Sequence, residues 1–157
     1  MDGSVQSNHD VKGYVAKCLL INPDNRILLL KIGEHTKYPY LSHTSDLPGG
    51  IVKENETPDE GAQRETREET GIDIPLSELR EVYRARTVVA GVGTVVEKRL
   101  YLAQVTTSEV NLSYEHQSYR WITLDELLHK KFVGFYFDDF IEEALRRLVD
   151  ERLIETI

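Results

Sequence analysis

Carboxylates crowd one short stretch of this chain. Glu65, Glu68 and Glu69 lie three and four residues apart, so on a helix they project from one face. Like charges at this spacing destabilise an isolated helix by roughly 0.2–0.5 kcal/mol per pair. Arg64 stands four residues before Glu68 and can pair with it, but one arginine cannot neutralise three carboxylates. A divalent cation can, and oxygen ligands at this density suit Mg²⁺ or Mn²⁺, with water and a substrate phosphate completing the coordination.

The residues around these carboxylates predict the helix that must position them. Thr57 is a good N-cap, Pro58 suits the first helical position, and Glu60 completes a T-x-x-E capping box. Gly71 fits the residue that closes a helix in the left-handed conformation. We therefore expect a helix from Pro58 to about Thr70.

Most acidic runs are simply solvated helix faces, and that alternative applies to any E-x-x-E-E run. Here the flanking residues favour a site. The run 47–50, Leu-Pro-Gly-Gly, precedes the helix, and its glycines let the backbone approach a ligand closely. Glu56 adds a further carboxylate just before the helix.

The stretch from Gly50 to Ile72 resembles the Nudix box, G-x5-E-x7-R-E-U-x-E-E-x-G-U, where U is a bulky aliphatic residue. The chain supplies the fixed residues at every spacing: Gly50, Glu56, Arg64, Glu65, Glu68, Glu69, Gly71 and Ile72. Thr66 departs from the pattern at the first U position. Because Thr66 is β-branched and can pack through its methyl group, we expect slightly weaker core packing and no loss of chemistry.

The resemblance implies roles for these residues. Glu56 would support the site by hydrogen bonding, and Arg64 would orient the neighbouring carboxylates. The metal-binding set would be the backbone carbonyl of Gly50 with Glu65, Glu68 and Glu69, and the cofactor Mg²⁺ or Mn²⁺. The activity would be hydrolysis of a phosphoanhydride bond.

The general base stays open at this point. In several proteins of this family an acidic residue in the loop before a tryptophan assists at the metal or activates water. Glu115, six residues before Trp121, is the candidate here, with Glu109 as the fallback. A box glutamate, most often Glu65 or Glu68, is the alternative.

Candidate substrate contacts lie outside the box. Residues 33–46 form a long polar segment that in the family commonly borders the substrate, so Lys37, Tyr38 or Tyr40 would touch phosphate or base; a solvated loop is the alternative. Arg86, in a later strand, has the fork geometry to grip a phosphate. Arg86 and its basic neighbours are equally suited to pair with acidic residues on an adjacent strand.

The substrate class follows only from the resemblance. The D-L-P-G-G run at 46–50 favours a nucleoside triphosphate, (d)NTP or oxidised nucleotide, whereas the E-H-Q-x-Y-R-W run from Glu115 resembles dinucleoside polyphosphate hydrolases. ADP-ribose hydrolases often carry a proline where this chain has Val88, which disfavours that alternative. Some Nudix-like domains bind nucleotides as regulators without cutting them, but these usually lose box glutamates that this chain keeps.

Length, charge and cysteine content bound the remaining classes. A chain of 157 residues fits one domain, with residues 1–10 as a flexible tail and 11–157 as the Nudix domain. A net charge of −8 disfavours duplex nucleic acid and anionic membranes as partners. Cys18 is the only cysteine, and no secretion signal or membrane span is evident, so we expect a cytoplasmic protein acting on small nucleotides. Homodimers are common in the family.

The remaining pattern predicts an α/β fold, the α/β/α sandwich of Nudix proteins with a mixed central β-sheet. Apolar runs with turn residues between them predict two hairpins, 11–21 with 26–32 and 79–90 with 94–106. A short strand at 119–122 leads to a helix capped by Thr123, and an amphipathic helix begins near Asp139. The aromatic run 132–137 is expected in the core, with the lining of a base pocket as the alternative.

Overall fold

The computed structural model describes residues 11–89, 93–129 and 138–152. The predictions for residues 1–10 and 132–137 lie outside the described residues. The elements are β1 (Val11–Ile21), β2 (Ile27–Ile32), the 3-10 turn η3 (Pro39–Leu41), β3 (Ser45–Asp46), β4 (Gly49–Ile51), α1 (Pro58–Thr70), the 3-10 turn η4 (Leu76–Glu78), β5 (Arg80–Val89), β6 (Thr94–Gln104), β7 (His116–Ile122), α2 (Leu124–Leu128) and α3 (Asp138–Asp150). The strands form one mixed sheet ordered β3-β2-β1-β6-β5, with β4 paired to β1 and β7 paired to β2.

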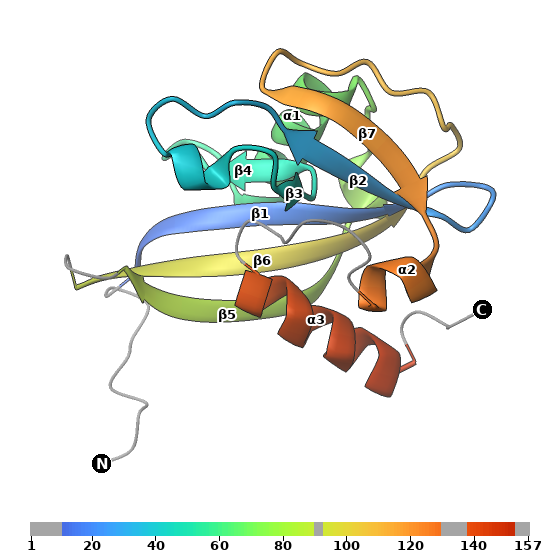
Figure 1. Ribbon diagram of the computed structural model, residues 1–157. Helices are drawn as coiled ribbons and strands as arrows, with labels where there is room; N and C mark the ends of the chain where they lie inside the picture. The colour runs from blue at the N-terminus through green and yellow to red at the C-terminus, as the bar shows by residue number, and fades with distance from the viewer. Residues whose placement is uncertain (1–10, 90–92, 130–137, 153–157) are drawn as a thin grey trace.

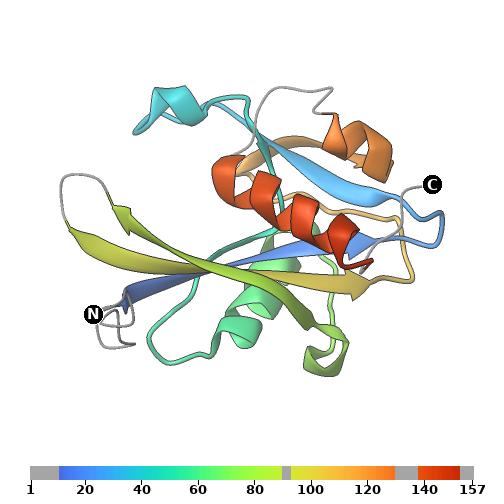
Figure 2. The same ribbon diagram turned by 90° about the horizontal axis from the view of Figure 1, so that it is seen from below.

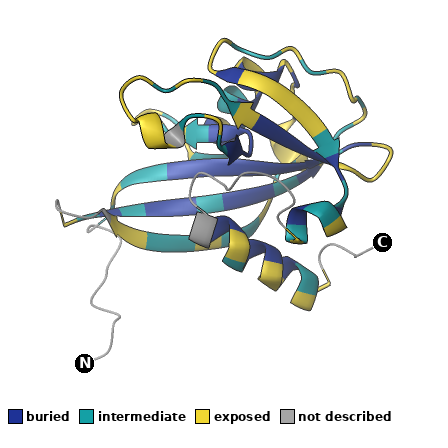
Figure 3. Ribbon diagram, in the orientation of Figure 1, coloured by how far each residue is buried: buried dark blue, intermediate teal, exposed yellow. Residues whose placement is uncertain are grey.

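The sheet lies between helices on its two faces, which confirms the α/β prediction. Figures 1 and 2 show α1 on one face and α3 on the other. β1 runs parallel to β6 along its whole length, from Val11 opposite Val95 to Ile21 opposite Gln104. The middle of β1 is buried on both faces (Figure 3), as expected for a nearly continuous apolar run in a central strand.

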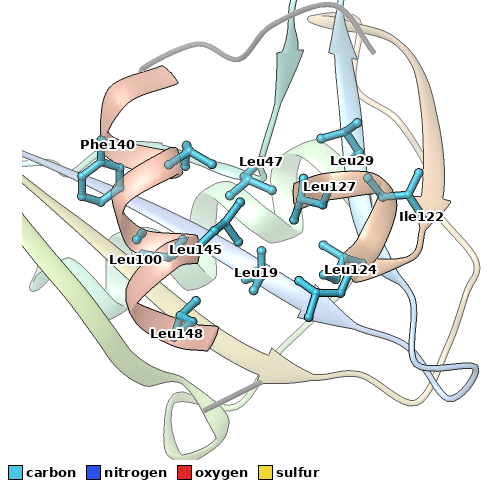
Figure 4. Close-up of a cluster of buried hydrophobic side chains, with 13 residues drawn as sticks. Leu19, Leu29, Leu47, Leu100, Ile122, Leu124, Leu127, Phe140, Leu145 and Leu148 are labelled. Carbon is cyan, nitrogen blue, oxygen red and sulfur yellow. The ribbon is translucent and has the colours of Figure 1, made fainter. Parts of the chain in front are cut away.

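Two hydrophobic clusters hold these layers together. On the α1 face, Ala62 and Ile72 pack against alternate residues of β1 such as Ala16 and Leu20. On the other face, α2 and α3 pack over Leu19 and its neighbours (Figure 4). α3 begins at Asp138, one residue before the predicted cap, a difference within the usual uncertainty of helix ends.

The first predicted hairpin is correct only at its turn. β1 and β2 pair at Ile21 opposite Ile27 and then separate. Beyond that point the edge of β1 is taken by β4, with Lys17 opposite Gly49, while β2 pairs with β7 and β3. Figure 1 shows β2 and β7 fanning away from β1. The separation opens the sheet where the box begins.

The second hairpin and the last strand follow the prediction more closely. β5 and β6 pair antiparallel, with Ala85 opposite Lys98. β7 begins at His116, three residues before the predicted start. Thr123 caps α2 in a capping box with Glu126. In the part of the chain that the structure describes, no helix has the length and apolar character needed to cross a membrane.

α1 forms where the sequence predicts it. The Glu60 carboxylate accepts a hydrogen bond from the Thr57 backbone N–H at 2.8 Å, and Gly71 closes the helix with φ of 74°. Thr66, the departure from the box, is fully buried and its hydroxyl donates to the Cys18 sulfur at 3.4 Å. The helix therefore docks on β1 through a polar contact as well as through its apolar residues.

Candidate active site

A cleft of about 580 Å³ lies where β1 and β2 separate. Its walls come from β1, the end of β2, the turn into β4, the inner face of α1 and the loop before β7. Gly50, Glu65, Glu69 and Glu115 all line it. The structure thus brings together residues of the box and the loop glutamate that the sequence singled out.

Arg64 lies at the centre of the box carboxylates. Its NH2 nitrogen is 2.7 Å from Glu56 Oε1, and its NH1 nitrogen is 3.1 Å from both Glu65 Oε1 and Glu68 Oε2. The hydrogen bond from Arg64 lowers the pKa of Glu56 to about 2, and the same bond raises the pKa of Arg64. One guanidinium therefore sets the direction of three carboxylates, which is the geometry needed to orient them.

Glu69 has a different environment from the other box glutamates. Its side chain is buried, and its Oε1 accepts a hydrogen bond from the Gly49 N–H at 2.8 Å. Burial raises the pKa of Glu69 to about 7, against the opposing effects of Lys17 and of this hydrogen bond. Glu69 is therefore anchored to the glycine turn, whereas Glu65 and Glu68 point to Arg64.

The glycine turn fits against both β1 and α1. Gly49 has φ of 130°, and a Cβ there would lie 2.1 Å from the Ala16 carbonyl oxygen. A Cβ on Gly50 would lie 2.9 Å from the Glu65 carboxylate carbon. A side chain is excluded at Gly49 by the backbone of β1, whereas at Gly50 it would have to displace the Glu65 carboxylate. The two glycines therefore let the backbone lie directly beside the carboxylate cluster.

The donor set fits a hard divalent cation in its chemistry. Carboxylate oxygens and a backbone carbonyl are the ligands that Mg²⁺ and Mn²⁺ prefer, and Gly50 leaves backbone next to Glu65. Among the residues that the structure describes, no three His, Cys, Asp or Glu side chains are already grouped so that they could hold a metal ion. Glu65 and Glu68 would have to turn from Arg64 to serve as ligands.

The two candidates for the loop base differ in position. Glu115 lines the same cleft as Glu65, and its backbone carbonyl accepts a hydrogen bond from the Gly33 N–H at 3.5 Å. Glu109 is exposed and is not among the residues that line the cleft. The geometry therefore favours Glu115 over Glu109 as the residue that can reach a substrate.

The expected substrate contacts do not line the cleft directly. Lys37 directly follows the lining residues His35 and Thr36, and Tyr40 comes three residues later in the chain. Tyr38 and Tyr40 have ring centroids 6.0 Å apart, and the Lys37 Nζ lies 5.4 Å from the Tyr38 centroid. These side chains form an exposed aromatic and cationic cluster, with Tyr40 75% exposed.

Arg86 lies on the β5–β6 hairpin and pairs with an acidic residue. Its Nε is 3.2 Å from Glu97 Oε1, and Arg99 contacts the same carboxylate at 2.8 Å. Arg86 therefore pairs with an acidic residue of the adjacent strand, which is one of the two roles expected from the sequence. A direct contact with substrate phosphate stays a prediction for this residue, which is not among those that line the cleft.

A buried ion pair that was not identified from the sequence lines the cleft. Lys17 and Asp46 form an ion pair at 3.0 Å, with side chains 5% and 7% exposed. The His116 Nε2 lies 3.8 Å from Asp46 Oδ2. The signal available in the sequence was a lysine inside the otherwise apolar run of β1, because a lysine buried in a strand needs a partner.

Comparison with known proteins identifies the family. The NUDIX domain model matches residues 11–150, so the chain belongs to the Nudix domain family. A crystal structure of a MutT protein from Methanosarcina mazei Go1 has a TM-score of 0.73 and 25% identity to this chain, covering 91% of this chain and 96% of that one.

Two curated relatives match shorter segments. A MutT-like protein of Streptomyces ambofaciens is 29% identical over 109 residues, 69% of this chain and 62% of that protein. The asymmetrical bis(5'-nucleosyl)-tetraphosphatase of Mus musculus is 38% identical over 81 residues, 50% of this chain and 55% of that protein. The chain thus spans less than two thirds of the length of both relatives.

Proposed function

We propose that this protein is a metal-dependent pyrophosphohydrolase that cleaves a phosphoanhydride bond of a nucleotide. The observation that carries the proposal is the cluster of Glu56, Glu65 and Glu68 around Arg64, beside a glycine turn. Glu65 of this cluster and Glu115 line the same cleft. Membership of the Nudix domain family supports it.

The residues of the site have separate roles in metal binding, in orienting the carboxylates and in proton transfer. Gly50, through its carbonyl, and Glu65, Glu68 and Glu69 would hold Mg²⁺ or Mn²⁺, which when bound neutralises charge on the phosphate oxygens. Arg64, held by Glu56, keeps the Glu65 and Glu68 carboxylates together by hydrogen bonds. Both carboxylates would turn from Arg64 toward a bound cation. Glu115 accepts the proton of the attacking water, with Glu65 or Glu68 as the alternative base.

The favoured substrate is a nucleoside triphosphate, canonical or oxidised. The MutT-like relative aligns over 109 residues, against 81 for the tetraphosphatase, and the MutT protein of Methanosarcina mazei shares most of its fold with this chain. The exposed cluster of Lys37, Tyr38 and Tyr40 offers a cation for phosphate and aromatic faces for a base. Because acidic residues are in excess over the whole chain, a polyanionic substrate would be attracted by the site itself and not by the general surface charge.

A dinucleoside polyphosphate is the second candidate. The mouse relative, which is named as a bis(5'-nucleosyl)-tetraphosphatase, is 38% identical over its matched segment. Tyr114 lines the cleft beside Glu115 and is 97% exposed, so it offers a stacking face for a second base in addition to that of Tyr38. A substrate with two bases would use both faces.

Product release across a nucleotide panel tests these assignments. Canonical and oxidised (d)NTPs, dinucleoside polyphosphates and ADP-ribose are incubated with Mg²⁺ or Mn²⁺ and with wild type, Glu68→Gln or Glu54→Gln. Glu54 is an exposed glutamate of the same segment and serves as the matched control. We expect metal-dependent turnover that falls by at least about 10²-fold in Glu68→Gln and is unchanged in Glu54→Gln.

The pattern of failure is equally informative. If a nucleotide binds and raises the melting temperature but no compound turns over, the chain is a nucleotide-binding module and the proposal is wrong. If Glu54→Gln loses as much activity as Glu68→Gln, the effect is not specific to the cluster around Arg64.

A further inference from the structure

A buried ion pair lies directly beneath the glycine turn. The Lys17 Nζ is 3.0 Å from both carboxylate oxygens of Asp46. Two residues further along β1, Leu19 packs into an apolar cluster. Replacing a buried ion pair with apolar residues is often neutral or stabilising, so stability alone is a poor reason for a lysine at this position.

Lys17 does more than neutralise Asp46. Its Nζ also lies 3.2 Å from the carbonyl oxygens of Leu47 and Gly49. An ammonium has three N–H donors, and these donors face four oxygen atoms. Lys17 therefore holds both ends of the segment that leads into β4.

Gly49 is held from the opposite side as well. Its N–H donates to Glu69 Oε1 at 2.8 Å, while its carbonyl accepts from Lys17. A continuous chain of contacts thus runs from β1 through Gly49 to the last carboxylate of the box on α1. The next residue, Gly50, lies against the Glu65 carboxylate.

We propose that Lys17 is a positioning residue that fixes the Gly49–Gly50 turn and, through Gly49, the Glu69 carboxylate for metal binding and hydrolysis. The proposal rests on the function proposed above. Lys17 acts through the backbone of the turn rather than by touching the substrate. Loss of its hydrogen bonds would let the turn move relative to α1 while the rest of the sheet stays intact.

The test variant removes the ammonium without leaving a buried charge. Lys17→Met alone would strand the Asp46 carboxylate, so Lys17→Met is combined with Asp46→Asn. An asparagine at 46 can still accept the hydrogen bond that Asp46 Oδ1 takes from the Leu47 N–H at 2.9 Å. Lys12→Met is the matched control, because Lys12 is an exposed lysine of the same strand.

Three measurements report on the mobility of the turn, on metal binding and on catalysis. Hydrogen exchange of the Gly49 amide is measured by NMR in metal-free protein, Mn²⁺ binding by electron paramagnetic resonance without substrate, and kcat and KM with the best substrate. For the double variant we expect faster Gly49 exchange, Mn²⁺ affinity and kcat each lower by roughly 10–100-fold, and KM within about threefold of wild type. Lys12→Met should match wild type throughout.

The proposal and the function fail separately. A folded double variant with wild-type Gly49 exchange and Mn²⁺ affinity overturns the role of Lys17, whatever its activity. Wild-type protein that binds Mn²⁺ but cuts no nucleotide overturns only the proposed function, and wild type without Mn²⁺ affinity overturns both. Asp46→Asn alone keeps the lysine and should retain Mn²⁺ affinity; a loss as large as in the double variant would assign the effect to Asp46 and overturn the role of Lys17.

A second variant covers loss of folding. If methionine at position 17 prevents folding, Lys17→Gln with Asp46→Asn replaces it, because the glutamine amide keeps a donor without the charge. We expect Mn²⁺ affinity at least about threefold below wild type for that protein. An unchanged affinity would overturn the proposal.

Discussion

The ion pair between Glu56 and Arg64 predicts an acid-dependent loss of stability. Glu56 has a pKa of about 2, lowered from 4.5 chiefly by the hydrogen bond from Arg64 and further by Lys53. Its side chain is only 13% exposed. A shift of this size corresponds to at most about 3–4 kcal/mol, and solvent screening reduces the expected contribution to about 1–2 kcal/mol.

The sign follows from which state binds the proton more tightly. The unfolded chain, with the higher pKa, takes up the proton first as the pH falls, so protonation favours unfolding. The stabilisation is therefore complete above about pH 4.5 and is lost as the pH falls toward 2. Glu56→Gln should remove it at neutral pH, and the difference from wild type should vanish near pH 2.

Urea unfolding followed by circular dichroism in chelator-treated buffer measures this contribution. The free energy of unfolding is compared at pH 7, 4 and 2.5 for wild type, Glu56→Gln and the control Glu54→Gln, whose side chain is exposed. If Glu56→Gln is equally destabilised at pH 7 and pH 2.5, the loss comes from packing and the electrostatic account is wrong.

Two further predictions concern the contacts of β1. Gly49→Ala should lower the free energy of unfolding by at least about 2–3 kcal/mol, because φ is 130° and the new Cβ would meet the Ala16 carbonyl. Thermal denaturation measures the loss of stability. The control Gly13→Ala, where a Cβ meets nothing within 4 Å, should change the stability little. An equal effect at both glycines would contradict the close approach. Cys18 should resist alkylation at pH 8 in the folded protein and react in urea, because burial raises the pKa of its thiol to about 12. A thiol-reactive dye measures the rate of labelling in both states. Rapid labelling of the folded protein would contradict the buried environment.

The sequence predicted best those features that depend on neighbours along the chain. The helix from Pro58 to Thr70 formed as expected because Thr57, Glu60 and Gly71 supply both of its ends locally. The same holds for the capping box at Thr123. The fixed spacing of the box also brought Arg64 within reach of the carboxylates at positions 65 and 68, since both are its neighbours on the helix.

Features that depend on distant partners were not visible in the sequence. β3 and β4 are two and three residues long, too short for an apolar pattern, and they exist because β2 and β1 offer free edges. Pairing along the chain suggested a full hairpin of β1 with β2, but β6 and β4 take the two edges of β1 instead. The cleft forms because of that exchange of partners.

The same reasoning explains why Lys17 escaped notice although it was the most unusual residue in its strand. A box glutamate is identified by its spacing within one helix, whereas the partners of Lys17 come from the segment 46–49, 29 to 32 residues further along the chain. The cost of burying a lone lysine is large, so its presence in an apolar run implies a specific set of acceptors even before their identity is known. In this fold those acceptors are Asp46 and the backbone of the glycine turn. A charged residue in a buried strand is therefore a useful pointer to a site whose other members lie far away in sequence.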